Sequence, residues 1–195
     1  MNYNIVILGD YYVGKSSIIN RIINNSFESV TYSTIGTSYF SKEINLDNNN
    51  KVIKFSIWDT AGQERFRSFV TFYLKNPHII YLCYDITVAQ TFNNLKKWMN
   101  TINQNNRLDK YLGVLIGTKS DLNTFRQITF DQGKEYADSI NFFFYETSSK
   151  ENTNIDTLFD FTIDTFIKQN KNKLEKDDIE DNKINLKKNN YFTYC

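Results

Sequence analysis

Residues 9–16 read Gly9-Asp10-Tyr11-Tyr12-Val13-Gly14-Lys15-Ser16 and stand between an apolar run, Tyr3–Leu8, and a helical pattern, Lys15–Asn24. This is the spacing G-x-x-x-x-G-K-S/T, in which backbone N–H groups of a tight loop line a concavity suited to phosphate oxygens. The N-terminus of the following helix adds unpaired N–H donors and a positive partial charge. A glycine-lysine turn before a helix also occurs without any ligand, but the strand and the helix around it favour a phosphate site.

The rest of the chain alternates short apolar runs with helical patterns, which predicts βαβ units and a parallel sheet. The further strands are expected at Tyr39–Leu46, Val52–Trp58, His78–Tyr84, Leu112–Gly117 and Phe142–Tyr145. The turn-forming cluster Asp47–Asn50 predicts that the first two of these form a hairpin. Further helices are expected over Phe92–Ile102, from Thr129 to about Ile140 and from Ile155. The predicted fold is one α/β domain with a six-stranded, mostly parallel sheet, one antiparallel hairpin strand and helices on both faces.

Composition excludes several classes of protein. The chain has 195 residues and a net charge of +1, which offers no basic patch for nucleic acid. Two cysteines, Cys83 and Cys195, and one histidine, His78, argue against a disulfide scaffold or a zinc cluster. The longest apolar run, Ile79–Tyr84, is far below the roughly 20 residues that cross a bilayer. We expect a cytoplasmic monomer with a globular domain over residues 1–168 and a flexible tail over 169–195.

Two further segments complete the predicted phosphate and metal site. Asp59 leaves a strand where a carboxylate can hold Mg²⁺ through water, and the Ser16 hydroxyl is expected to bind the same ion. Gly62 lets the backbone approach a γ-phosphate, and Gln63 can orient an attacking water. Thr34 would reach Mg²⁺ only when a γ-phosphate draws its loop inward. The expected phosphate-binding residues are Tyr12, Val13, Gly14, Lys15, Ser16, Ser17, Thr34 and Gly62.

The base is predicted separately from the phosphates. Thr118-Lys119-Ser120-Asp121 follows the strand Leu112–Gly117 and therefore lies at the carboxyl edge of the sheet, where ligands bind. The Asp121 carboxylate can accept hydrogen bonds from the ring N–H and the exocyclic amine of guanine, whereas adenine presents an acceptor in place of that N–H. Lys119 would lay its aliphatic stem across the base. The segment Ser148-Ser149-Lys150 follows the last strand and can offer a backbone N–H to the guanine carbonyl. A lysine-aspartate pair in a loop is usually solvated charge, but its position after a buried strand favours guanine.

These motifs, taken in order, resemble the small GTPases of the Ras superfamily. They are the residue 9–16 loop, Thr34, Asp59 to Gln63, Thr118 to Asp121, and Thr147-Ser148-Ser149-Lys150. Within the superfamily the chain resembles the Rab family over roughly residues 3–168. That resemblance rests on Ser33-Thr34-Ile35-Gly36, on Ile57 to Ser68, and on Tyr84-Asp85-Ile86-Thr87 followed by Phe92-Asn93-Asn94.

The resemblance implies a GTP/GDP switch in vesicle-mediated traffic that hydrolyses GTP with Mg²⁺. It implies an exchange factor, a GTPase-activating protein, a GDP-dissociation inhibitor and effectors that contact residues 31–42 and 59–75. It also implies that Phe27 packs against the guanine edge. The expected guanine-binding residues are then Phe27, Thr118, Lys119, Asp121, Ser148, Ser149 and Lys150.

The chain departs from the Rab pattern in the phosphate loop and in the tail. Tyr11 and Tyr12 stand where the family has small or short polar residues, Thr118 stands where asparagine is commoner, and Ser149 replaces an alanine. Rab proteins mostly end with two cysteines, whereas this sequence ends Tyr191-Phe192-Thr193-Tyr194-Cys195 and lacks the C-a-a-X box. Two states of Cys195 are open, an unmodified thiol and a lipidated one. We expect lipidation, which would let the protein cycle between the cytoplasm and the cytosolic face of an endomembrane.

Two functions of different classes fit these residues. The first is a GTP-hydrolysing timer in which Gln63 orients the attacking water. Its intrinsic rate would be slow, because neither the phosphate loop nor residues 27–40 contain an arginine to act in cis. The second is a GTP-binding adaptor deficient in hydrolysis, because the Tyr11 ring beside the γ-phosphate would crowd Gln63 or block an incoming arginine. The intact Gln63 favours the timer. Another branch of the Ras superfamily is a further alternative.

Overall fold

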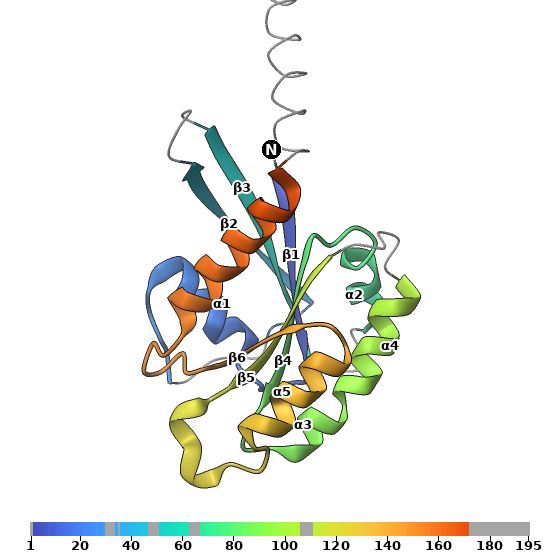
Figure 1. Cartoon of the computed structure of the whole chain (residues 1–195), viewed down its shortest axis with the longest axis vertical. Coiled ribbons are helices and arrows are strands. Elements are labelled where there is room, and N and C mark those ends of the chain that lie inside the picture. Colours follow the sequence, from blue (N-terminus) through green and yellow to red (C-terminus); the bar gives the residue numbers. More distant parts are fainter. Residues whose placement is uncertain are drawn as a thin grey trace, which may run out of the picture. The chain divides into compact units, whose positions relative to one another are not determined.

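The computed structural model describes residues 2–29, 34, 36–46, 51–62, 67–105 and 111–171. Its strands form a single six-stranded sheet in the order β2-β3-β1-β4-β5-β6 (Figure 1). The strands are β1 (Asn2–Gly9), β2 (Thr37–Leu46), β3 (Lys51–Thr60), β4 (Ile79–Asp85), β5 (Leu112–Thr118) and β6 (Phe143–Thr147). Only the β2–β3 pair is antiparallel among these strands, and every other pair is parallel. The predicted sheet, including its hairpin, is confirmed.

The helices follow the predicted positions with three differences. They are α1 (Lys15–Asn24), α2 (Arg67–Tyr73), α3 (Ala89–Asn93), α4 (Leu95–Asn105), the 3₁₀ helix η2 (Ser120–Phe125), α5 (Phe130–Ser139) and a helix over residues 155–171. Helices α2 and η2 were not predicted, because seven and six residues are too short to show helical periodicity. The single helix expected over Phe92–Ile102 is wrong, since α3 and α4 are separate.

Local hydrogen bonds account for these helix boundaries. Helix α1 begins after Gly14, which has a positive φ of 92°, and ends just before Asn25, whose φ of 49° is also left-handed. The early start of α3 follows from Thr91, whose hydroxyl donates to the Val88 carbonyl at 2.7 Å. At the start of α5 the predicted capping box is confirmed: the Thr129 hydroxyl accepts from the Gln132 N–H, and the Gln132 side chain accepts from the Thr129 N–H.

Helices cover both faces of the sheet. Along β1, Val6 and Leu8 belong to a buried cluster with Trp98 of α4 and with residues of α2 and α5. The neighbouring residues Ile5 and Ile7 are equally buried, and alternation along the strand turns them to the other face, where α1 contacts β1, β2 and β3. Figure 1 shows α1 on one side of the strands and α2, α4 and α5 on the other.

The parallel strands bring four loops to one edge. Because β1, β3, β4, β5 and β6 all run in the same direction, their carboxyl ends lie together. The loops after β1, β3, β5 and β6 are those that the sequence singles out for phosphate, metal and base. The sheet topology therefore gathers segments that are more than 130 residues apart in the sequence, from Gly14 to Lys150.

The chain divides into two units, Met1–Phe159 and Asp160–Cys195. The first holds the whole sheet and the four loops. The second includes the later part of the helix over residues 155–171. The domain boundary expected after residue 168 stays a prediction. None of the helices in the described ranges has both the length and the apolar character needed to cross a bilayer.

Candidate nucleotide-binding pocket

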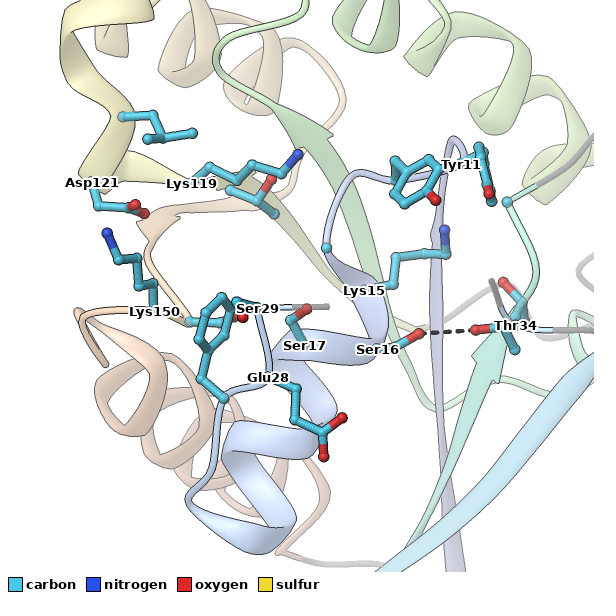
Figure 2. Close-up of a pocket in the computed structure, with 18 residues that line it drawn as sticks. Tyr11, Lys15, Ser16, Ser17, Glu28, Ser29, Thr34, Lys119, Asp121 and Lys150 are labelled. Carbon is cyan, nitrogen blue, oxygen red and sulfur yellow. Dashed lines mark hydrogen bonds between the residues drawn. The ribbon is translucent and has the colours of Figure 1, made fainter. Parts of the chain in front are cut away.

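A pocket of about 490 Å³ lies at the carboxyl edge of the sheet. Most of the predicted site residues line it: Tyr12, Gly14, Lys15, Ser16, Ser17, Phe27, Thr34, Gly62, Thr118, Lys119, Asp121, Ser149 and Lys150. Figure 2 shows Asp121 and Lys150 at one end, and Tyr11, Lys15 and Thr34 at the other. Val13, Asp59 and Ser148 do not line the pocket, but each is hydrogen-bonded to a residue that does, as described below. Gln63 and Cys195 fall outside the described residues, so their predicted roles stay predictions.

Lys15 is held at the phosphate-loop end by the loop itself. Its ammonium donates to the carbonyl of Gly9 at 3.0 Å and to that of Asp10 at 2.8 Å. Since an ammonium has three N–H donors, one donor is left for another acceptor. Burial lowers the pKa of Lys15, although the negative charge of Asp59 opposes this shift. The pocket therefore contains a desolvated cation, which attracts anions more strongly than a solvated lysine does.

Three oxygen-bearing side chains from three segments meet beside Lys15. The Ser16 hydroxyl donates to Oδ2 of Asp59 at 2.5 Å, and it lies 3.0 Å from the Thr34 hydroxyl (Figure 2). Thr34 in turn lies 3.4 Å from the same carboxylate oxygen. The other oxygen of Asp59, Oδ1, is buried without a hydrogen-bond partner. Burial raises the pKa of Asp59, and the Ser16 hydrogen bond opposes this shift. An unsatisfied buried carboxylate beside two hydroxyls has the donor chemistry that Mg²⁺ prefers.

The other end of the pocket is tied to the phosphate loop. The Thr118 hydroxyl donates to the Val13 carbonyl at 2.6 Å and also lies 2.9 Å from the Tyr84 carbonyl. Lys119 has a left-handed backbone with φ of 62°, and its ammonium lies 2.5 Å from Oδ2 of Asp85. Because this ion pair holds the charged head of Lys119 at β4, its aliphatic stem forms the pocket wall. These contacts fix where Thr118 and Lys119 lie, and the role of both in binding a base stays a prediction.

Two contacts that position residues at this end of the pocket were not predicted from the sequence. The Ser148 hydroxyl donates to Oδ1 of Asp121 at 2.6 Å. Arg21 of α1 donates from Nε to the Ser149 carbonyl at 2.9 Å and from a terminal nitrogen to the Lys150 carbonyl at 3.2 Å. Both contacts join segments over 20 residues apart, so no local pattern signals them. Arg21 holds the Ser149–Lys150 loop against the pocket.

An aromatic pair forms the rim at the phosphate-loop end. The ring centroids of Tyr11 and Tyr12 are 4.0 Å apart with an angle of 64° between the ring planes, and both residues line the pocket. Tyr12 adopts a left-handed φ of 62°, a conformation that costs a residue with a side chain about 1–2 kcal/mol. Gly62 lies directly against the Asp10–Tyr11 peptide: a Cβ on Gly62 would be 2.4 Å from the Asp10 carbonyl oxygen. Glycine is therefore required at position 62 for this approach.

Comparison with known proteins agrees with this geometry. The Ras family pattern matches residues 4–168 of the chain. The chain is 36% identical over 161 residues to Ras-related protein RabC of Dictyostelium discoideum, covering 83% of this chain and 82% of that protein. It is 40% identical over 159 residues to Ras-related protein Rab-1C of the same organism, covering 82% and 78%. The chain belongs to the Ras family of small GTPases, and these Rab proteins are among its relatives.

Proposed function

We propose that this protein is a Rab-like switch that binds GTP and GDP with Mg²⁺, hydrolyses GTP, and regulates vesicle-mediated membrane traffic. The main support for this proposal is that two chemically different groups of residues lie at opposite ends of one pocket. Lys15 and the Ser16–Thr34–Asp59 cluster lie at one end, and the Asp121 carboxylate lies at the other. A molecule with a polyanionic end and a base that donates two hydrogen bonds matches both ends.

The phosphate end is proposed to act by charge neutralisation and positioning. Lys15 directs its remaining N–H to the β- and γ-phosphates, and the N-terminus of α1 adds backbone donors. Ser16, Thr34 and, through water, Asp59 would hold Mg²⁺, which supplies charge neutralisation when bound. Since Thr34 and Gly62 come from separate loops, contacts of both with a γ-phosphate would order these loops only in the GTP state.

The base end is proposed to select guanine. Asp121 accepts from the ring N–H and the exocyclic amine, and Ser148 fixes the rotation of that carboxylate. Phe27 and the Lys119 stem line the pocket where they can cover the two faces of the base. The backbone of Ser149 and Lys150, held by Arg21, is proposed to donate to the guanine carbonyl.

Hydrolysis is assigned to Gln63, which orients the attacking water, with an activating protein that adds about 10³–10⁵ in rate. We further propose that an exchange factor, a GDP-dissociation inhibitor and effectors act on the switch, as expected for a Rab-like protein. A lipid on Cys195 would attach the GTP form to the cytosolic face of an endomembrane. Mass spectrometry of Cys195 in protein from native cells tests this attachment, and an unmodified thiol there would contradict it.

Tyr11 favours a second candidate function, a GTP-binding adaptor deficient in hydrolysis. Tyr11 lines the pocket, and its backbone nitrogen is 2.5 Å from the position that a Cβ on Gly62 would take. A ring at this position would crowd Gln63 or block an incoming arginine. Single-turnover hydrolysis by wild type, Tyr11→Gly and Gln63→Leu separates the two functions. The timer predicts that wild type is clearly faster than Gln63→Leu. The adaptor predicts equal rates for those two proteins and a gain of about tenfold or more in Tyr11→Gly.

Calorimetric titration with GDP, GTP and ATP, each with Mg²⁺, tests nucleotide binding itself. Wild type should bind both guanine nucleotides and not ATP, and Asp121→Asn should lose about 100-fold or more in GDP affinity because an amide cannot accept both hydrogen bonds. Asp131→Asn, which removes an exposed carboxylate outside the pocket, is the matched control and should bind GDP normally. Absence of heat from GDP and GTP in wild type, or unchanged GDP affinity in Asp121→Asn, would refute the assignment.

A further inference from the structure

The Asp10 side chain is hydrogen-bonded to residues of the helices that pack on the face of the sheet opposite α1. Its Oδ1 accepts a hydrogen bond of 2.8 Å from the Trp98 indole N–H, and its Oδ2 accepts one of 2.7 Å from the Asn94 amide. Trp98 is fully buried in α4, and Asn94 lies at the junction between α3 and α4. Each carboxylate oxygen therefore has its own donor, and both donors come from one rigid part of the fold.

The orientation of these donors is itself fixed. Gln90 donates to the Asn94 side-chain oxygen at 3.1 Å, which turns the Asn94 amide N–H toward Asp10. The Trp98 indole has only a donor, so its contact with Asp10 has a single possible direction. A carboxylate is the one small side chain that accepts from both without offering a competing donor. Charge-assisted hydrogen bonds of this type are about twice as strong as neutral ones.

The main chain of the same residue forms part of the phosphate site. The Asp10 carbonyl accepts from the Lys15 ammonium at 2.8 Å, and the Asp10–Tyr11 peptide is the surface against which Gly62 lies. Figure 2 shows the Lys15 ammonium directed toward the Tyr11 end of the loop. The side chain of Asp10 thus holds in place a peptide that orients both Lys15 and Gly62, the two groups proposed to meet the γ-phosphate.

We propose that Asp10 is a positioning residue which, through Asn94 and Trp98, aligns the phosphate loop for the third phosphate of GTP and thereby sets the preference between GTP and GDP. This inference rests on the proposed nucleotide site. If the anchor is lost, the Asp10–Tyr11 peptide is free to rotate away from Lys15. GDP depends less on this contact, because the β-phosphate is held by the later part of the loop and by the start of α1.

A charge-conserving exchange tests the anchor. Asp10→Asn alone makes two amide N–H groups face each other, and Asn94→Asp alone makes two carboxylates face each other. In the double variant the amide at position 10 donates to the carboxylate at position 94 and still accepts from Trp98, so net charge and one hydrogen bond of each kind are retained. Trp98→Phe removes the indole donor together with part of a fully buried ring, so thermal unfolding must be read beside its affinities. Asn105→Ala is the control within α4, because it breaks a bond to the Thr101 carbonyl at the far end of the helix.

The readout is the ratio of affinities for a non-hydrolysable GTP analogue and for GDP, with thermal unfolding measured in parallel. Each of Asp10→Asn, Asn94→Asp and Trp98→Phe should lower this ratio about tenfold. The double variant should restore it to within about threefold of wild type, and Asn105→Ala should leave it unchanged. The inference is overturned if wild type binds both nucleotides but the ratio is the same in all variants, or if the double variant is no better than the worse single variant. A wild-type protein that binds neither nucleotide would instead refute the nucleotide site itself.

Discussion

The Ser148 hydroxyl donates a hydrogen bond of 2.6 Å to Oδ1 of Asp121. The same hydroxyl oxygen accepts from the Glu151 N–H at 3.0 Å, so the hydroxyl proton is directed to the carboxylate. Ser148 is completely buried, and Asp121 lines the pocket. One residue of the loop after β6 thus fixes the rotation of the carboxylate that follows β5, and hydrogen bonds join the two loops at the end of the pocket that is proposed to bind the base.

Loss of the Ser148 hydroxyl should weaken guanine binding without abolishing it. In Ser148→Ala the Asp121 carboxylate gains rotational freedom and loses one hydrogen bond, worth about 0.5–1.5 kcal/mol, so GDP affinity should fall about 3–10-fold. Ser149→Ala is the matched control, because the proposed contact of Ser149 is its backbone N–H, and it should bind GDP as wild type does. Calorimetry with GDP measures both. Equal affinity in all three proteins would show that Ser148 does not position Asp121.

The Ser16 hydroxyl should matter chiefly through the metal. Ser16→Ala removes a direct partner of the Asp59 carboxylate and a proposed Mg²⁺ ligand, and should raise the Mg²⁺ concentration needed for nucleotide retention about 10–100-fold. The neighbouring Ser17 also lines the pocket, but its proposed contact is the backbone N–H, so Ser17→Ala should change this concentration little. GDP release measured across a Mg²⁺ series provides the comparison. A similar Mg²⁺ requirement in both variants would argue against the cluster as a metal site.

The ion pair between Arg126 and Glu146 should contribute to the stability of the sheet edge that is proposed to bind the base. Two parallel hydrogen bonds of 2.6 and 2.7 Å join the guanidinium to the carboxylate, and both side chains are mostly buried. Glu146→Gln leaves Arg126 with an incompletely satisfied charge and should lower the free energy of unfolding by about 1–3 kcal/mol. Glu151→Gln, at an exposed site with a 3.7 Å contact to Lys150, should change it by less than about 0.5 kcal/mol. Urea denaturation of both variants would contradict the prediction if the two effects were equal.

Cys83 should be inert in the native protein. Burial raises the pKa of its thiol from 9.0 to about 12, so the thiol stays protonated at pH 8. Iodoacetamide at pH 8 should modify Cys83 in urea but not in buffer, which mass spectrometry of peptides detects. Between pH 9.0, the ordinary pKa that applies to the unfolded chain, and about pH 12, the native protein keeps the Cys83 proton while the unfolded chain loses it. The stability contributed by this group is therefore present below pH 9 and is lost as pH rises toward 12, by at most about 1.4 kcal/mol per pH unit. Rapid modification of Cys83 in buffer would show that its thiol is not buried in the native protein.

Local patterns were sufficient for most of the elements but not for the short ones. Helix α1 and the α5 capping box are determined by contiguous residues, and the sequence predicted both. Helix α2 and η2 are too short to show a period, and the division between α3 and α4 depends on contacts made by Thr91 and Asn94. Among site residues, those in recognisable spacings such as Lys15 and Asp121 were predicted. Gln63 lies outside the described residues, and its role is still a prediction.

The sequence by itself determined the alternation of strands and helices, the phosphate-loop spacing and the identity of the carboxylate proposed to select the base. These depend on periodicity and on residue types a few positions apart. Tertiary structure alone decided which side chains fix those groups in place: Ser148 on Asp121, Arg21 on the loop at Ser149, and Trp98 with Asn94 on Asp10. Each of these contacts joins residues that only the parallel sheet brings to one edge, and no spacing within the chain encodes a hydrogen bond across 27 to 128 positions.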